Sequence, residues 1–124
     1  MKRDTDLIRL LLIEVEADSR HDGRNQFVMR PTFDGYSSAD INYHFAMLLD
    51  GGYVTGRMRT NLAFSCGGLT MAGHDLLDAL RDDEVWRKTK GAANSAGSWT
   101  IDLLKQIATA YAKNKLKQVT GLEV

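Results

Sequence analysis

The sequence predicts an α+β, mainly α fold: a winged helix-turn-helix-like core with an added C-terminal amphipathic helix. Three observations predict it. A short capped helix over residues 38–50 ends at Gly51-Gly52 and leads directly into a strand. A helix and a short strand precede this segment, and a second strand follows. The last part of the chain keeps a helical period of apolar residues.

The helix over 38–50 has start and stop signals at both ends. Ser37 or Ser38 can accept a hydrogen bond from the first free N–H groups. Gly51 or Gly52 can take the left-handed conformation that ends a helix. The apolar residues recur at spacings of three and four, which places them on one face: Ile41, Phe45 and Leu48 or Leu49.

The remaining elements follow from the same kinds of pattern. Leu7, Leu11 and Val15 form an apolar stripe on the first helix. In a winged helix-turn-helix domain a short helix usually precedes the recognition helix, which here is the helix over 38–50. That short helix is not evident, and a strand and turn over 26–36 replace it. The expected elements are helices over 4–17, 38–50, 71–90 and 98–118, and strands over 26–30, 53–59 and within 62–70.

A chain of 124 residues is expected to form one domain. We expect a winged-helix-like core over 1–90, a short linker over 91–97, and a C-terminal helix over 98–118. That helix either packs on the core or forms the seam of a homodimer, because the apolar stripe over 101–116, with Trp99 beside it, needs a partner.

Composition limits the cellular setting. A single cysteine, Cys66, allows no internal disulfide and suits a reducing compartment. No apolar run approaches the length of a membrane span, and charged residues interrupt the start of the chain, unlike a secretory signal. We therefore expect a cytoplasmic protein that does not contact a membrane.

Charge is balanced overall but unevenly distributed. Sixteen basic and sixteen acidic residues cancel, whereas a dedicated nucleic-acid binder is usually basic. Residues 1–83 hold nine basic and thirteen acidic side chains, whereas residues 84–117 hold seven basic and two acidic side chains. The basic third either attracts an anionic partner or consists of ordinary solvated helix faces.

Five residues are candidates for binding nucleic acid. Ser38, Asn42 and Tyr43 lie on the proposed recognition helix and can donate to phosphates or base edges. The strands over 53–59 and within 62–70 form the proposed wing. Arg57 and Arg59 lie two residues apart on the first of these strands, so both side chains can face one phosphate backbone. The alternative is a pair of exposed arginines that discourage pairing at a sheet edge.

Other charged residues favour a protein partner instead. The proposed recognition helix carries Asp40 and Asp50 but no lysine or arginine. These aspartates, or Lys105 and Lys113 on the last helix, are candidates for binding a host or phage protein. His44 can contact a base or phosphate, but a partly buried structural histidine is the favoured interpretation.

The sequence contains no pattern typical of an enzyme or of a cofactor site. His74, Asp75 and Asp78 do not have the spacing of a known metal site. Nothing orients Cys66 and His74 as a nucleophile and its base. No phosphate-binding glycine motif, nucleophile elbow or dinucleotide fingerprint is present. We therefore expect no catalytic residue, no metal and no cofactor.

Three stretches resemble a family of short phage and prophage proteins known as domain of unknown function 2513. They are MKRDTDLIR at 1–9; GYS, INYH and LLDGGY between 35 and 53; and LTMAGHDLLDALRDD at 69–83 followed by Trp86. The resemblance implies a winged-helix-like fold and a phage or mobile-element setting, and it implies no activity. One departure is Met71-Ala72, where members of the family often have a Trp-Glu pair.

Two functional hypotheses remain open. The first is a small winged-helix DNA-binding protein, a regulator or accessory factor that acts as a homodimer on double-stranded DNA. The second is a protein-interaction module on the same fold, for example a phage protein that inhibits a host factor. The arginines of the wing favour the first hypothesis, and the zero net charge favours the second.

Overall fold

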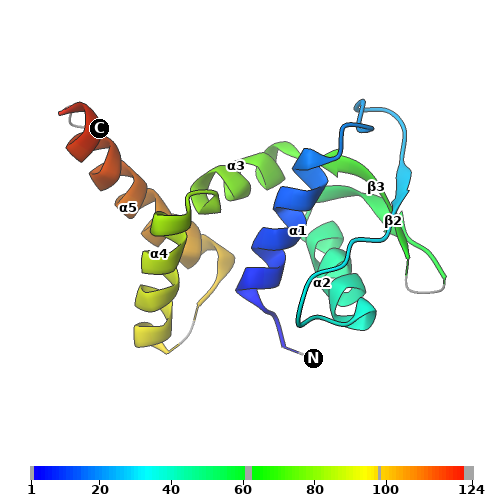
Figure 1. Cartoon of the computed structure of the whole chain (residues 1–124), viewed down its shortest axis with the longest axis horizontal. Helices are drawn as coiled ribbons and strands as arrows, with labels where there is room; N and C mark the ends of the chain where they lie inside the picture. Colours follow the sequence, from blue (N-terminus) through cyan, green and yellow to red (C-terminus); the bar gives the residue numbers. More distant parts are fainter. Residues whose placement is uncertain (1, 61–62, 98, 122–124) are drawn as a thin grey trace. The chain divides into compact units, whose positions relative to one another are not determined.

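The computed structural model describes residues 2–60, 63–97 and 99–121. The chain divides into two compact units, Met1–Leu77 and Asp78–Val124. Across the described residues the fold is α+β and mainly helical, with a small antiparallel sheet, so the predicted winged-helix-like class is confirmed (Figure 1). None of the helices in these ranges is both long and apolar enough to cross a membrane.

The first unit contains the winged-helix-like core. Its sheet has the strand order β1-β3-β2 with antiparallel neighbours. No helix interrupts residues 30–37, as the sequence predicts. The elements are α1 (Thr5–Ala17), β1 (Phe27–Met29), α2 (Ser38–Asp50), β2 (Val54–Met58), β3 (Phe64–Leu69) and the start of α3 (Met71–Leu80).

The two ends of α2 are fixed by the residues around them. Ser37 is the N-cap: its side chain accepts the Asp40 N–H, and the Asp40 carboxylate accepts the Ser37 N–H, each at 3.0 Å. This reciprocal pair satisfies two of the N–H groups that a helix start leaves open. At the other end, Gly52 takes a φ of 78°, which turns the chain directly into β2.

The core of the first unit lies between α1, α2 and the sheet. The rings of Phe45 on α2 and Phe64 on β3 stack with centroids 3.7 Å apart and planes 10° from parallel. The apolar stripe predicted for the first helix is buried here, where α1 contacts both α2 and β3. The other buried apolar residues of this unit include Leu7, Leu11, Leu12, Val15, Met29, Ile41, Leu48, Val54 and Cys66.

Thr70 joins the end of β3 to the start of α3. Its hydroxyl donates to the Gly52 carbonyl oxygen at 2.5 Å and accepts the Gly73 N–H at 3.1 Å. Thr70 therefore caps α3. The backbone at Gly73 passes against the Tyr53 carbonyl so closely that a Cβ there would overlap it. This contact holds α3 against the start of the wing.

The second unit consists of the end of α3, α4 (Asp83–Ala96) and α5 (Ile101–Thr120). The single helix predicted over 71–90 is wrong, because Asp82 is extended (φ −71°, ψ 125°) and caps α4 by accepting the Val85 N–H. The linker predicted over 91–97 is also wrong. Helix α4 continues to Ala96 and ends where Gly97 takes a left-handed conformation.

Helix α4 packs against α5 inside the second unit. Thr89 and Ala93 are buried on α4, and Leu104 and Ala108 are buried on α5. Part of the apolar stripe predicted for the last helix therefore has its partner within this chain. At the start of α4 the Lys115 ammonium lies 2.6 Å from the Asp82 carboxylate, and this hydrogen bond is the main reason why the pKa of Asp82 is lowered.

The loop after α1 depends on two ionised carboxylates. The hydrogen bond from the Arg20 side chain lowers the pKa of Asp18 from 3.8 to about 2. Backbone N–H groups of Asn25 and Arg24 do the same for Asp22, whose pKa is also about 2. Arg20 in turn donates to the Val28 carbonyl at the outer side of β1.

We expect this loop to lose its order in acid. A carboxylate whose pKa is depressed in the fold stabilises it fully above its unfolded value, and that contribution is lost as the pH falls through the folded value. Here the window runs from about pH 4 down to about pH 2. Carboxyl NMR titration should give midpoints near 2 for Asp18 and Asp22. Midpoints near 3.8 for both would contradict the hydrogen bonding described here.

Candidate nucleic-acid interface

Helix α2 presents a mixed polar and aromatic surface on the side away from the core. Ser38 is exposed in its first turn and Asn42 is half-buried one turn later. Tyr43 is 41% exposed, and its ring meets the His44 ring edge-on with centroids 5.7 Å apart. The three candidates predicted on this helix therefore lie on its first two turns and are at least partly accessible.

His44 has a structural role, as the favoured interpretation expects. The residue is buried, its Nε2 accepts the Asp4 N–H at 2.8 Å, and its Nδ1 lies 2.7 Å from the Asp40 carbonyl oxygen. Since Nε2 must accept, the proton lies on Nδ1 and is donated to that carbonyl. Asp4 also caps α1 and accepts from the Tyr36 hydroxyl at 3.1 Å, so this network joins the starts of α1 and α2.

The two arginines of the wing share one face of the sheet. Arg57 on β2 pairs with Ser65 on β3, and residues that pair directly in a sheet point to the same side. Arg59 donates from Nη1 to the Ser65 hydroxyl at 3.3 Å, which places its side chain on that side too. Both arginines are exposed, and neither forms an ion pair with another described residue.

A third arginine lies at the same end of the sheet. Phe64 pairs with Met29 on β1 and with Met58 on β2. Arg30 comes directly after Met29, and Arg59 comes directly after Met58. The two arginines therefore lie on either side of Ala63, whose carbonyl oxygen accepts the Arg59 N–H. Arg30 is not among the residues predicted from the sequence, because its place beside the wing depends on strand register.

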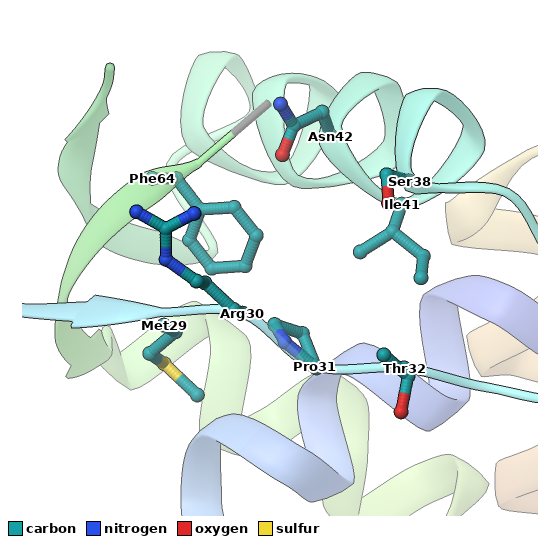
Figure 2. Close-up of a pocket in the computed structure, with 8 residues that line it drawn as sticks. All are labelled: Met29, Arg30, Pro31, Thr32, Ser38, Ile41, Asn42 and Phe64. Carbon is teal, nitrogen blue, oxygen red and sulfur yellow. The ribbon is translucent and has the colours of Figure 1, made fainter. Parts of the chain in front are cut away.

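A hollow of about 220 Å³ lies between the first turns of α2 and the segment after β1. Figure 2 shows Arg30 extending from that segment toward the helix, on the side of Asn42, whereas the Thr32 hydroxyl points away from the helix. The hollow is lined by Met29, Arg30, Pro31, Thr32, Ser38, Ile41, Asn42 and Phe64. Two predicted candidates, Ser38 and Asn42, thus meet a cation that the prediction did not include.

The polar side chains of this hollow are not used by the fold. Arg30, Ser38 and Asn42 make no side-chain hydrogen bond or ion pair with any other residue in the described ranges. Arginine has only donors, and serine and asparagine can each donate as well. The arrangement is therefore suited to receive an acceptor-rich, negatively charged group.

The predicted partner-binding residues belong to both units, with Asp40 and Asp50 in the first and Lys105 and Lys113 in the second. Asp40 completes the capping box of α2 by accepting the Ser37 N–H, and hydrogen bonding to Ser37 lowers the pKa of its carboxyl group. Asp50 is exposed at the last position of α2. In the second unit, Lys105 and Lys113 line one shallow surface of α5 together with Gln106, Thr109 and Ala110.

The other chemically notable residues do not form a site in the described part of the chain. There, no three His, Cys, Asp or Glu side chains come together in a way that could hold a metal ion. Cys66 is buried in the central strand, and burial raises the pKa of its thiol. The His74 ring is half exposed, with Nδ1 4.0 Å from a carboxylate oxygen of Glu16 on α1. The corner between β3 and α3 is held by Thr70.

Comparison with known proteins places the chain among relatives without assigned functions. A family described as hypothetical protein, DUF2513, matches residues 2–99. An uncharacterized protein of Haemophilus influenzae is 33% identical over 120 residues, which cover 94% of this chain and 99% of that protein. No solved structure matches the chain.

Proposed function

The chain belongs to the DUF2513 family of hypothetical proteins, and from its fold and its interface we propose that it is a cytoplasmic winged-helix DNA-binding protein. It would act as a regulator or accessory factor of a phage or prophage. Winged-helix folds serve several functions, so the proposal depends on the site and not on the fold alone.

One observation carries this proposal. Arg57 and Arg59 share one face of the wing, Arg30 follows β1 at the same end of the sheet, and no carboxylate among the described residues pairs with any of the three. Arginines without a carboxylate partner are available to phosphates, and Arg59 keeps free donors beyond the one it gives to Ser65.

In the proposed complex, α2 faces the bases and the wing faces the backbone. Asn42 has the donor and acceptor pair that reads an adenine edge, and the Tyr43 hydroxyl can reach a phosphate. The charges of Asp40 and Asp50 oppose close approach of DNA to the two ends of α2. The arginines must therefore provide the attraction, and binding should depend strongly on salt.

A salt titration tests the proposal. Each phosphate contact contributes about 0.9 to the slope of log binding constant against log salt concentration. We expect wild-type protein to bind random-sequence duplex at low salt, and Arg57→Ala/Arg59→Ala to reduce that slope by about 2. Filter binding or fluorescence anisotropy at several salt concentrations measures both quantities.

The matched control removes the same charge elsewhere. Arg24→Ala/Arg87→Ala takes away two exposed arginines outside the interface and should leave the slope close to that of wild type. Equal losses in both double variants would indicate a general charge effect. Wild-type protein that binds no duplex at low salt would rule out the proposal.

A protein-interaction module is the second candidate function. The supporting observation is that Lys105 and Lys113 share one open surface of α5, whereas the α4 side of that helix is already covered. An acidic host or phage protein would fit this surface. Lys105→Glu/Lys113→Glu should then abolish capture of a stoichiometric partner while leaving DNA binding by the first unit unchanged.

We also propose that the protein acts as a homodimer through the end of α5. Leu116 is 46% exposed and Val119 is 77% exposed, although the earlier part of the apolar stripe is buried against α4. Sedimentation at micromolar concentration should show a dimer that Leu116→Lys converts to monomer. A wild-type monomer at that concentration would exclude this arrangement.

A further inference from the structure

The hollow beside α2 is too small for a cofactor or a drug-sized ligand. Pockets that bind cofactors or drug-sized molecules usually measure about 300–1,000 Å³, whereas this one measures about 220 Å³. It can therefore receive one protruding group of a larger partner.

We propose that the hollow holds a single backbone phosphate of the bound nucleic acid, with Arg30 as the principal contact and Asn42 and Ser38 as neutral donors. The inference rests on the proposed DNA-binding function and extends it. It adds a fixed anchor beside the recognition helix to the contacts of the wing. Arg57 and Arg59 lie on the sheet and do not line the hollow.

The donors of the hollow favour an anion over a neutral group. Arg30 offers five N–H donors and no acceptor, and Ser38 and Asn42 add a hydroxyl and an amide. None of these side chains is engaged with another described residue, so a phosphate would not have to displace an internal hydrogen bond. Arginine and phosphate also match in geometry, since two parallel N–H groups can meet two phosphate oxygens.

The position of Arg30 is restrained before anything binds. Its neighbour Pro31 disfavours the helical region for the preceding residue and keeps Arg30 extended. The residue before Arg30, Met29, pairs with Phe64 in the sheet, and this pairing holds the backbone that leads into Arg30. A cation whose backbone is held in this way loses less conformational entropy on binding than one on a mobile loop.

The floor of the hollow argues against a stacked base. Bases bind single sites chiefly by stacking on an accessible aromatic face. The ring of Phe64 is 1% exposed and already stacks on Phe45, and Ile41 is 4% exposed. The hollow therefore offers a mostly covered apolar floor under a polar rim. Such a floor lowers the local dielectric and strengthens the attraction between Arg30 and a phosphate.

One nearby charge opposes the phosphate. The Asp40 carboxylate lies on the first turn of α2, but it does not line the hollow and it is bonded to the Ser37 N–H. Neutral donors alone would not overcome this repulsion. Arg30 is consequently the residue on which binding in the hollow depends.

The first test separates the hollow from the wing. Arg30→Ala should weaken duplex binding and reduce the slope of log binding constant against log salt concentration by about 1. This reduction should add to that of Arg57→Ala/Arg59→Ala. Arg30→Lys should keep the slope but bind more weakly, because the paired N–H geometry is lost. Thr32→Ala alters a residue that lines the hollow but points away from α2, and it should match wild type. Duplex binding with an unchanged slope in Arg30→Ala would overturn the inference and leave the proposed function standing.

The second test does not require duplex binding. Inorganic phosphate, titrated into ¹⁵N-labelled protein against chloride at equal ionic strength, should shift the Asn42 side-chain amide and the Ser38 backbone amide. Arg30→Ala should abolish these shifts. Phosphate shifts without any duplex binding would show that the hollow binds phosphate, but would reject both the DNA-binding proposal and a nucleic-acid backbone as the source of that phosphate. No shift at either residue would reject the hollow.

Discussion

Replacing Phe45 by alanine is expected to cost about 3–5 kcal/mol of the free energy of unfolding. The Phe45 side chain is fully buried, and its ring stacks on Phe64 at the centre of the first unit. Deletion removes buried apolar surface from α2 and β3 together and leaves a cavity that the sheet cannot easily fill. The free energy of unfolding of a natural domain is about 5–15 kcal/mol in total, so the variant should be close to unfolding.

Urea denaturation followed by circular dichroism measures this loss. Phe45→Leu keeps most of the volume and should cost clearly less than the alanine variant. Tyr43→Ala is the matched surface control on the same helix, because Tyr43 is 41% exposed, and it should change the midpoint little. An alanine variant at position 45 with wild-type stability would show that the stacked pair does not support the core.

Replacing Gly73 by alanine is expected to lower the free energy of unfolding by about 1–3 kcal/mol, although alanine favours helices. A Cβ at this position would overlap the Tyr53 carbonyl oxygen, which is a backbone atom that cannot rotate away. Either α3 moves off the start of the wing or the hydrogen bond between the Thr70 N–H and that carbonyl is lost. The thermal midpoint and the amide exchange rate of Thr70 report these two outcomes.

Gly91→Ala gives the opposite expectation and serves as the control. Gly91 lies inside α4, and a Cβ there would meet nothing within 4 Å. The substitution should stabilise the protein by up to about 1 kcal/mol through helix propensity alone. If both glycine variants stabilised the protein, the close approach of α3 to Tyr53 would be disproved.

The first unit was largely predictable because its signals are local. Ser37 and the glycine pair at 51–52 mark the ends of α2 within a few residues of the sequence, and the apolar spacing between them identifies the buried face. The structure reproduces this helix over the predicted range. The cap of α3 by Thr70 is likewise a contact between near neighbours.

The break between α3 and α4 was missed although a local cue existed. Asp82, Asp83 and Glu84 are the acidic residues that favour the first turn of a helix. The continuous apolar spacing from Leu76 to Trp86 hid this start signal. The segment 91–97 was mistaken for a linker because its small polar residues favour loops, whereas burial of Ala93 against α5 keeps it helical.

The candidate interface was predictable only in part. Arg57 and Arg59 share a face because they lie two apart on one strand, and sequence spacing alone contains that information. Arg30 joins them through the register of β1 on β3, and no spacing in the chain indicates it. The role of Asp40 as a cap also depends on its reciprocal bond with Ser37, which a list of charges cannot distinguish from an exposed binding residue.

The burial of Cys66 makes the chain convenient for site-specific labelling. It is the only cysteine in the sequence, it lies fully buried in the central strand, and burial raises the pKa of its thiol. Thiol reagents react with thiolates, so the native residue would be modified only when the sheet opens. A cysteine introduced at an exposed position beside α2 would therefore carry a fluorophore alone. The slow reaction of Cys66 would at the same time report how often the sheet opens.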